Sequence, residues 1–282
     1  MNDRAHHEIA RARLLSVKRE PLFFSDWKRA LFMHFEVEPG LLQSAVPFKL
    51  DLRGGKAYVS LVAFTMHRMR PRLGGRLTEW CCKPMATHEL LNLRTYVCHR
   101  GEPGIYFMAE WIPNRLSAFL GPRAFGLPYR LGRLKYEHDH ERDNLRGEVE
   151  DMRHAGRANS LRLKYTATIG GESRGAPQDR AFRPCAANSL DEFLVERYTA
   201  FTQYGSKARF FRVWHTPWPQ VPARVLLVED SLLRGAFPCL ETARLVGANY
   251  SPGVQEVWMG RPHHIKKCRR RNTVLSSFFE TP

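Results

Sequence analysis

The stretch GPRAFGLPYR, residues 121–130, separates a predicted helix from a predicted strand and ends on two side chains that restrict the chemistry. Its Gly-Pro pair is expected to end a helix over residues 114–120, and a strand is predicted over residues 133–136. Its last two residues are Tyr129 and Arg130. A phenol with an ordinary pKa of about 10 is a poor nucleophile for a carbonyl, and a guanidinium stays protonated in proteins. Neither side chain can act as a neutral amine nucleophile.

The composition indicates a folded and strongly basic protein. Its 282 residues suffice for one large domain or two ordinary ones. Hydrophobic residues make up 43% of the chain and aromatic residues 11%, which is enough for a sizeable core and excludes a disordered chain. The formal net charge of +16 attracts anions such as phosphates, acidic metabolites and nucleic acid.

The cysteines and the apolar runs indicate a cytoplasmic protein. The six cysteines form no CxxC pair, so they are expected to be free thiols in a reducing compartment. The amino terminus lacks the apolar core of a signal peptide. No apolar run approaches the roughly 20 residues that a membrane helix needs, so we expect no membrane partner.

The pattern of residues predicts many short strands and few helices. Residues 56–64 are rich in β-branched and aromatic side chains, residues 90–97 alternate, and a turn at 101–104 leads into a strand at 105–109. Further strands are predicted at 133–136, 160–169, 208–215, 224–228 and 255–259. Helices are predicted at 39–46, at 114–120 and after the capping residue Ser189. This balance favours a barrel or a sandwich.

The chain shows no internal repeat and no linker that would divide it. We therefore predict an arm or helix at residues 1–22, a single domain over 23–260 and a basic, mobile tail at 261–282.

Several residue runs occur in the same order as in a known family. They are Trp27…Pro39, Leu50-Asp51, Gly55…Val59, Asn92–Val97, Gly104–Phe107, Leu127–Tyr129, Glu196–Tyr198, His215–Pro219 and Tyr250–Val254. Together they resemble the YqjF-like family of uncharacterised proteins, a domain of unknown function, from about Trp27 to Trp258.

The YqjF-like family is grouped with the acetoacetate decarboxylase-like superfamily. This resemblance implies a mainly β (α+β) fold, a closed cone-shaped β-barrel with a few peripheral helices and a central small-molecule cavity. The opening stretch is similar to the segment that carries the lysine pair of acetoacetate decarboxylases, with Tyr129 and Arg130 at the lysine positions. Lys135, five residues beyond Arg130, is the nearby lysine that could take over the role.

Three arginines are candidates to hold a carboxylate or a phosphate by paired hydrogen bonds, namely Arg94, Arg130 and Arg123. Asn92 is expected to join them, since it lies on the same strand face as Arg94. The competing interpretation places Arg94 and Arg123 in solvent or in ion pairs.

Tyr129, His34 and Glu89 are candidates to exchange protons in the same cavity. For His34 we favour the competing interpretation of a core histidine with satisfied hydrogen bonds. The family usually places a glutamate two residues before the asparagine of the Asn-x-Arg motif, whereas Glu89 lies three before Asn92. On a regular strand this spacing puts Glu89 on the opposite face, unless a bulge restores it.

The run His215-Thr216-Pro217-Trp218-Pro219 holds a histidine and a tryptophan in a loop braced by two prolines. His215 and Trp218 are candidates for ligand stacking or proton transfer at the barrel mouth. An equally favoured interpretation is a turn that plugs one end of the barrel.

The run His138-Asp139-His140-Glu141 resembles part of a metal site, but no other cluster supplies the third and fourth ligands. We interpret it as a solvated charged loop and expect no metal. Nucleotide-binding fingerprints are absent from the sequence, and we expect no cofactor.

These observations leave three classes of function. The first is an enzyme acting on a keto acid or a related carboxylate, and the second is a non-catalytic protein that binds the same ligand. The third and least favoured is a basic surface that binds nucleic acid, with weak nonspecific polyanion contact through residues 261–282. Whether the chain is an enzyme and whether it forms a homo-oligomer stay open.

Overall fold

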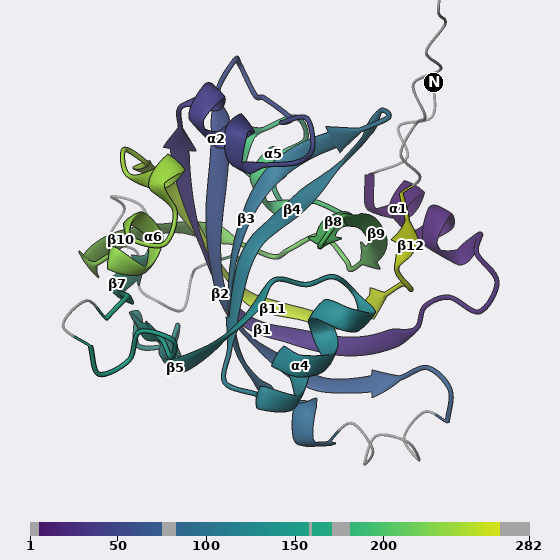
Figure 1. Ribbon diagram of the computed structural model, residues 1–282. Helices are drawn as coiled ribbons and strands as arrows, with labels where there is room; N and C mark the ends of the chain where they lie inside the picture. The colour runs from purple at the N-terminus through teal and green to yellow at the C-terminus, as the bar shows by residue number, and fades with distance from the viewer. Residues whose placement is uncertain (1–5, 75–82, 158–159, 171–180, 266–282) are drawn as a thin grey trace, which may run out of the picture.

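A computed structural model describes residues 6–74, 83–157, 160–170 and 181–265. The strands of these residues form one twelve-stranded mixed sheet (Figure 1). The strands are β1 (Phe23–Val37), β2 (Ala57–Pro71), β3 (His88–His99), β4 (Glu102–Ile112), β5 (Tyr129–Asp139), β6 (Asn144–Asp151), β7 (Arg162–Ile169), β8 (Thr199–Tyr204), β9 (Lys207–Trp214), β10 (Val221–Glu229), β11 (Arg244–Met259) and β12 (His263–His264). The α-helices are α1 (His6–Leu15), α2 (Pro39–Ala45), α4 (Arg115–Ala124), α5 (Leu190–Val195) and α6 (Ser231–Arg234).

The sheet closes into two circuits of hydrogen bonds that share a wall. The strand order is β12-β9-β8-β4-β3-β2-β1-β11-β10-β7-β6-β5, with additional pairings of β9 with β11 and of β4 with β5. One circuit therefore runs through β8 and β9, and the other runs through β5, β6, β7 and β10. Both use the wall β4-β3-β2-β1-β11, which lies between them in Figure 1. The predicted closed, mainly β barrel is confirmed.

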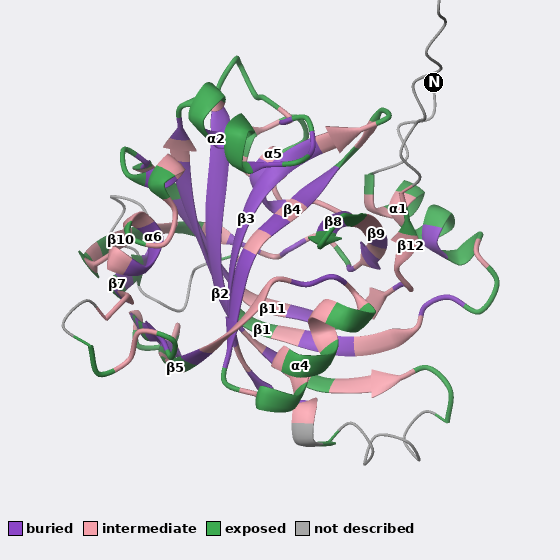
Figure 2. Ribbon diagram, viewed as in Figure 1, coloured by how far each residue is buried: buried purple, intermediate pink, exposed green. Residues whose placement is uncertain are grey.

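The shared wall is buried on both of its faces (Figure 2). Every residue from Ala57 to Phe64 in β2 is buried. Neighbouring side chains of a strand point to opposite faces. In β3, Leu91 and Leu93 accordingly enter the core of the circuit through β5–β7 and β10, while Leu90 enters the core of the circuit through β8 and β9. This explains why the wall strands are continuous apolar runs rather than alternating ones.

The strands predicted from the sequence all lie within observed strands or overlap them, whereas β1, β6, β8 and β12 carried no strand prediction. In β1 the register shifts on both sides of Asp26, and Arg29 has a φ of 55°, so no simple period runs through it. The helix predicted to end at Gly121-Pro122 instead continues to Ala124. That prediction was wrong because the last turn is closed further on, where the N–H groups of Phe125 and Gly126 bond to the carbonyls of Gly121 and Pro122.

Both ends of the described chain lie against the barrel. Within the predicted arm, α1 contacts β9. The first residues of the predicted tail are also attached, because His263 and His264 pair with β9 and Arg261 forms an ion pair with Glu20. The rest of the tail, residues 266–282, lies outside the described residues.

The described residues bear on two further expectations from the sequence, the state of the cysteines and the absence of a membrane helix. Cys98, Cys185 and Cys239 are free thiols, and the other three cysteines lie outside the described part of the chain. None of the helices in the described residues has the length and apolar character needed to cross a membrane.

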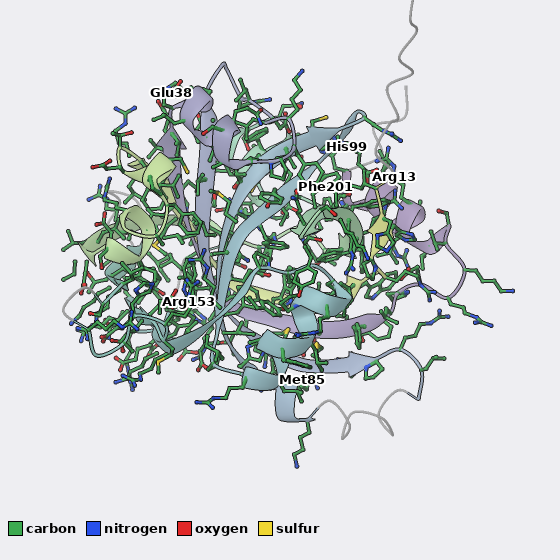
Figure 3. The ribbon with its side chains drawn as sticks, viewed as in Figure 1. Arg13, Glu38, Met85, His99, Arg153 and Phe201 are labelled. Atoms are coloured by element: carbon green, nitrogen blue, oxygen red, sulfur yellow. The ribbon has the colours of Figure 1, made fainter. Side chains whose placement is uncertain are left out.

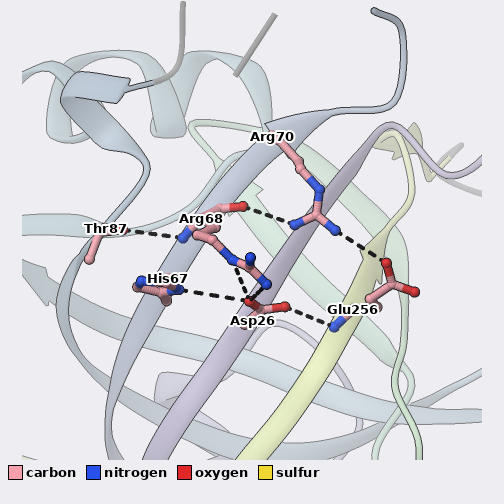
Figure 4. A network of polar contacts seen from close by, with 6 residues as sticks. All are labelled: Asp26, His67, Arg68, Arg70, Thr87 and Glu256. Atoms are coloured by element: carbon pink, nitrogen blue, oxygen red, sulfur yellow. Dashed lines mark hydrogen bonds and ion pairs between the residues drawn. The ribbon is translucent and has the colours of Figure 1, made fainter. Parts of the chain in front are cut away.

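Asp26 is a fully buried carboxylate that joins three strands (Figure 4). Its Oδ2 accepts hydrogen bonds from Nε and Nη2 of Arg68 in β2 at 3.0 and 2.7 Å, and its Oδ1 accepts one from the backbone N–H of Glu256 in β11 at 3.0 Å. Burial alone would raise the pKa of Asp26, but the hydrogen bonds from Glu256 and Arg68 outweigh it and lower the pKa. Asp26 therefore stabilises the wall in its ionised form.

We expect Asp26→Asn to lower the free energy of unfolding at pH 7 by about 2 kcal/mol, because charge-assisted hydrogen bonds to a buried group are lost. Since the folded pKa is depressed, the wild-type advantage is complete above the unfolded pKa of about 4 and declines as pH falls below it. Urea denaturation at pH 7 and at pH 3.5 measures both. Glu137→Gln, at the exposed Lys135–Glu137 pair, is the control and should change stability by less than about 0.5 kcal/mol. Equal stabilities of wild type and Asp26→Asn at pH 7 would contradict this account.

Candidate ligand-binding cavity

A cavity of about 70 Å³ lies inside the circuit that runs through β8 and β9. One water molecule needs only about 10–15 Å³ by this measure, so the cavity has room for a small organic molecule. Its wall is mostly aromatic and aliphatic, and the apolar lining includes Trp27, Phe32, Val62, Phe64, Ile105, Phe107, Phe211 and Trp218. Such a lining with a few polar groups is typical of a small-molecule site.

Three polar side chains of the cavity stand in register on adjacent strands. Asn92 of β3 is the register partner of Glu110 of β4, and Glu110 is the register partner of Tyr129 of β5. The parallel β4–β5 pairing includes the Glu110 N–H, which donates to the carbonyl of Pro128 at 3.1 Å. All three side chains line the cavity, so strand pairing assembles an amide, a carboxyl and a phenol at one part of its wall.

Burial favours the protonated, neutral form of the Glu110 carboxyl group. Its side chain is buried, and desolvation raises its pKa to about 8. Its Oε2 has no hydrogen-bond partner among the described residues, and Oδ1 of Asn92 has none either. Sequence reasoning missed Glu110, although an acid between Ala109 and Trp111, directly after the strand predicted at 105–109, was a usable signal.

Arg94 brings a positive charge to the same cavity. Its Nη2 donates to the carbonyl of Leu194, at the end of α5, at 3.0 Å, and its guanidinium lies 5.5 Å from the centre of the Phe32 ring. Its buried Nε has no hydrogen-bond partner among the described residues. In the described part of the chain no carboxylate lies within ion-pair distance of Arg94. The predicted anion-holding side chains Arg94 and Asn92 thus do face one cavity.

Tyr129 and Arg130 point in opposite directions. Tyr129 lines the cavity, and burial, followed by the proximity of Glu110, raises its pKa well above the usual value. The Arg130 guanidinium lies over Trp111 and Phe237, outside the cavity lining. Adjacent residues of a strand alternate between faces, so the structure does not place Arg130 with the ligand-binding group.

Glu89 and Arg123 also lie away from the cavity. Glu89 pairs with Thr65 in an unshifted stretch of the β2–β3 register, so no bulge moves it to the Asn92 face. Arg123 is exposed on α4, where its guanidinium donates to the carbonyl of Phe119. The structure therefore supports neither residue as part of the cavity site.

His34 belongs to a buried network outside the cavity lining. Its Nδ1 lies 2.7 Å from Oγ of Ser60 and its Nε2 lies 3.0 Å from Oδ1 of Asn249, so both ring nitrogens have partners. Burial, and then the charge of Arg94, lowers its pKa to about 3. His34 does not line the cavity, and the structure supports the interpretation as a satisfied core histidine rather than a proton donor to a ligand.

His215 and Trp218 line the cavity from the proline-braced loop. His215 Nδ1 donates to the carbonyl of Thr216 at 2.7 Å, which leaves Nε2 of the neutral ring as a proton acceptor. Burial lowers the pKa of His215, so the neutral form dominates at pH 7. Trp218 stacks on Trp27 and meets the edge of Phe32. This loop therefore forms part of the cavity wall.

The run around His138 is not the solvated loop that the sequence indicated. His138 is buried in β5, where its Nδ1 contacts the carbonyl of Arg29 at 2.7 Å and its Nε2 contacts the Tyr165 hydroxyl at 2.8 Å. His140 contacts the Tyr250 hydroxyl at 3.1 Å. The prediction failed because β5 runs further than expected and turns His138 into the core of the circuit through β5, β6, β7 and β10. In the described residues no group of three potential ligands gathers around a metal position.

No lysine of the described chain lines the cavity. Lys135 is exposed on the outer face of β5, where it pairs with Glu137 at 3.5 Å. The amine nucleophile of Schiff-base chemistry is therefore missing from the described part of this site.

The chain matches the DUF2071 family of uncharacterized conserved proteins over residues 25–255. It belongs to this family. It is 32% identical to the uncharacterized protein YqjF of Bacillus subtilis (strain 168) over 201 residues, which cover 68% of this chain and 72% of YqjF. The YqjF-like resemblance seen in the sequence is thereby confirmed.

The DUF2071 chain shares its fold with acetoacetate decarboxylase-like structures. An acetoacetate decarboxylase-like enzyme from Sphingomonas wittichii RW1 superimposes with a TM-score of 0.59 at 13% identity, covering 88% of this chain and 95% of that one. The acetoacetate decarboxylase of Legionella pneumophila gives 0.57 at 13% identity, covering 94% and 98%. The enduracididine biosynthesis enzyme MppR gives 0.58 at 12% identity, covering 88% and 92%. At these identities the likeness establishes the fold alone.

We expect Gly121→Ala to displace Tyr129 and to destabilise the protein by about 1–3 kcal/mol, because an added Cβ would overlap the Tyr129 ring. Alanine is otherwise favoured over glycine in a helix by about 1 kcal/mol, so the sign of the change identifies the clash. Urea denaturation measures it. Gly247→Ala is the control, since nothing lies within 4 Å of its added Cβ. A stabilised Gly121→Ala variant would contradict the packing described here.

We expect the pH dependence of stability to report the neutral Glu110. An unfolded glutamate ionises near pH 4.3, whereas folded Glu110 holds its proton to about pH 8. The folded state therefore loses stability as pH rises between these values, by at most about 1.4 kcal/mol per pH unit. Glu110→Gln removes this loss and should gain on wild type from pH 5 to pH 8 in urea denaturation. Glu148→Gln, at an exposed site, should give a constant difference. A constant difference for Glu110→Gln as well would show that Glu110 is ionised.

Proposed function

We propose that this DUF2071 protein binds a small carboxylate, such as a keto acid, in the cavity and transfers protons on it without an imine. The observation that carries the proposal is the set of three buried polar atoms without partners, Oε2 of Glu110, Oδ1 of Asn92 and Nε of Arg94. Buried polar groups in proteins are nearly always hydrogen-bonded. Three exceptions on one apolar cavity wall are what a bound ligand would satisfy.

The charges and donors of the site favour a carboxylate over a neutral or cationic ligand. Arg94 is a cation without a carboxylate partner in the described chain, and Glu110 and His215 are neutral at pH 7. A carboxylate on Arg94 would pair the buried charge, which otherwise stays uncompensated. The Glu110 hydroxyl is a donor that an ionised carboxylate could not provide.

The same groups support acid–base chemistry on a keto acid. With the carboxylate on Arg94, the Glu110 carboxyl would donate its proton to the keto oxygen, while Nε2 of His215 takes a proton from the adjacent carbon. A carbon–carbon double bond then forms between those two carbons, and the carbonyl π electrons become the O–H bond of an enol. In the reverse step His215 protonates the carbon, the carbonyl reforms, and the enol proton returns to the Glu110 carboxylate. A protein that only binds the ligand would use the same cavity without this exchange.

The structural neighbours are consistent with this class of ligand. MppR was determined in complex with pyruvate, and it shares the fold of this chain. That likeness supports a keto acid as the first ligand to test. It carries no residue roles across, because the sequences are 12% identical. Polyanion contact through residues 261–282 and assembly into a homo-oligomer stay predictions.

We expect Arg94→Ala to weaken pyruvate binding at least about tenfold, since the cation that pairs the carboxylate is lost. Isothermal titration calorimetry at pH 7 measures the change in Kd. Arg123→Ala is the matched control because this arginine is exposed on α4, away from the cavity, and it should leave the Kd unchanged. Equal weakening by both variants would place binding on the general basic surface instead.

Catalysis is tested by deuterium exchange into the methyl group of pyruvate, followed by proton NMR. Exchange that is lost in Glu110→Gln supports an enzyme, and tight binding without exchange supports the non-catalytic alternative. Borohydride treatment in the presence of pyruvate should give no covalent adduct, because no lysine of the described chain lines the cavity. An adduct found by mass spectrometry would overturn the imine-free proposal.

A further inference from the structure

An open groove of about 470 Å³ lies on the outside of the barrel, next to the cavity. It runs between α1, where Arg13 lines it (Figure 3), α5 and the start of β4. Arg197 and Thr199 line both the groove and the cavity. These two residues therefore form the boundary between the outer groove and the inner site.

Arg197 is held firmly at this boundary. Its Nη1 lies 2.8 Å from Oδ2 of Asp51, and its Nε donates to the carbonyl of Phe193 at 2.8 Å. Its guanidinium also lies 4.1 Å from the centre of the Phe193 ring. The side chain is 7% exposed, so the ion pair with Asp51 is poorly screened by solvent.

Two guanidinium groups that line the cavity, Arg94 of β3 and Arg197 after α5, thus bond to carbonyls at the end of α5. Arg94 donates to the carbonyl of Leu194, and Arg197 donates to the carbonyl of Phe193, the residue before Leu194. They differ in charge balance, because Arg197 is neutralised by Asp51, whereas Arg94 has no carboxylate within ion-pair distance in the described chain. The cavity therefore offers a ligand one uncompensated positive charge.

We propose that the Arg197–Asp51 ion pair selects monoanionic carboxylates and rejects dianions at the boundary of the cavity. This inference rests on the proposed function and deepens it by naming the charge of the ligand. A second carboxylate on a ligand would find Arg197 already paired and would meet the like charge of Asp51. Replacing the Asp51 carboxylate by an amide keeps a hydrogen-bond acceptor for Arg197 but releases its positive charge for a dianion.

Glu102, another acid that lines the groove, provides a matched control. Thr199 donates to Oε1 of Glu102 at 2.7 Å, and Oε2 of Glu102 lies 3.3 Å from Nη2 of Arg212. Glu102 and Arg212 line the groove but not the cavity. Glu102→Gln therefore removes the same charge from the same rim without freeing a guanidinium that faces the ligand.

The experiment compares two ligands of nearly equal size, monomethyl succinate with one charge and succinate with two, by isothermal titration calorimetry at pH 7. Wild type should bind monomethyl succinate at least about tenfold tighter than succinate. Asp51→Asn should lower the preference for monomethyl succinate over succinate by about tenfold, which abolishes or reverses it. Glu102→Gln should leave the preference unchanged. The wild-type ratio needs no variant, so it remains decisive even if Asp51→Asn does not fold.

Two results would overturn the inference. In one, wild type binds succinate as tightly as monomethyl succinate; in the other, folded Asp51→Asn keeps the wild-type ratio. Pyruvate separates this failure from failure of the proposed function. If pyruvate binds and depends on Arg94 while charge selection is absent, only the inference is wrong. If neither pyruvate nor monomethyl succinate binds to wild type, the proposed function and the inference fall together.

Discussion

The burial of one sheet on both faces is the constraint on which the rest of the structure depends. The wall β4-β3-β2-β1-β11 belongs to two closed circuits, so each of its strands sends alternate side chains into two separate interiors. A polar group in either interior is removed from bulk water, and burying it without a hydrogen-bond partner costs free energy. Every polar side chain of the wall must therefore find a partner inside the protein, bind a ligand or carry a penalty.

The polar groups of the two interiors meet this requirement differently. His34 and His138 each have hydrogen-bond partners at both ring nitrogens, and burial, the leading cause for both, lowers their pKa to about 3 and about 4. These histidines stabilise the packed sheet as neutral rings. The side chains of Asn92, Glu110 and Arg94 instead leave buried atoms without partners around a cavity. The contrast separates groups that hold the fold from groups that we propose bind a ligand.

The sequence predicted the barrel and part of the site, and the failures have physical causes. Asn92, Arg94, Tyr129, His215 and Trp218 do line one cavity. Arg130 was misplaced because strand alternation turns one member of an adjacent pair away, an effect that the spacing alone could have indicated. Glu110 and Arg197 were missed because their roles depend on register across β3–β5 and on a contact with Asp51, 146 residues earlier in the chain. Long-range pairing of this kind leaves no local pattern.

A crystal structure of the protein soaked with pyruvate tests the central claim most directly, namely that the unpartnered polar groups of the cavity form a carboxylate site. The account predicts a carboxylate within hydrogen-bond distance of Nε of Arg94, with another ligand oxygen accepting from the Glu110 carboxyl group, and no covalent bond to the protein. Pyruvate bound only on the outer surface, or joined to a lysine as an imine, would contradict it.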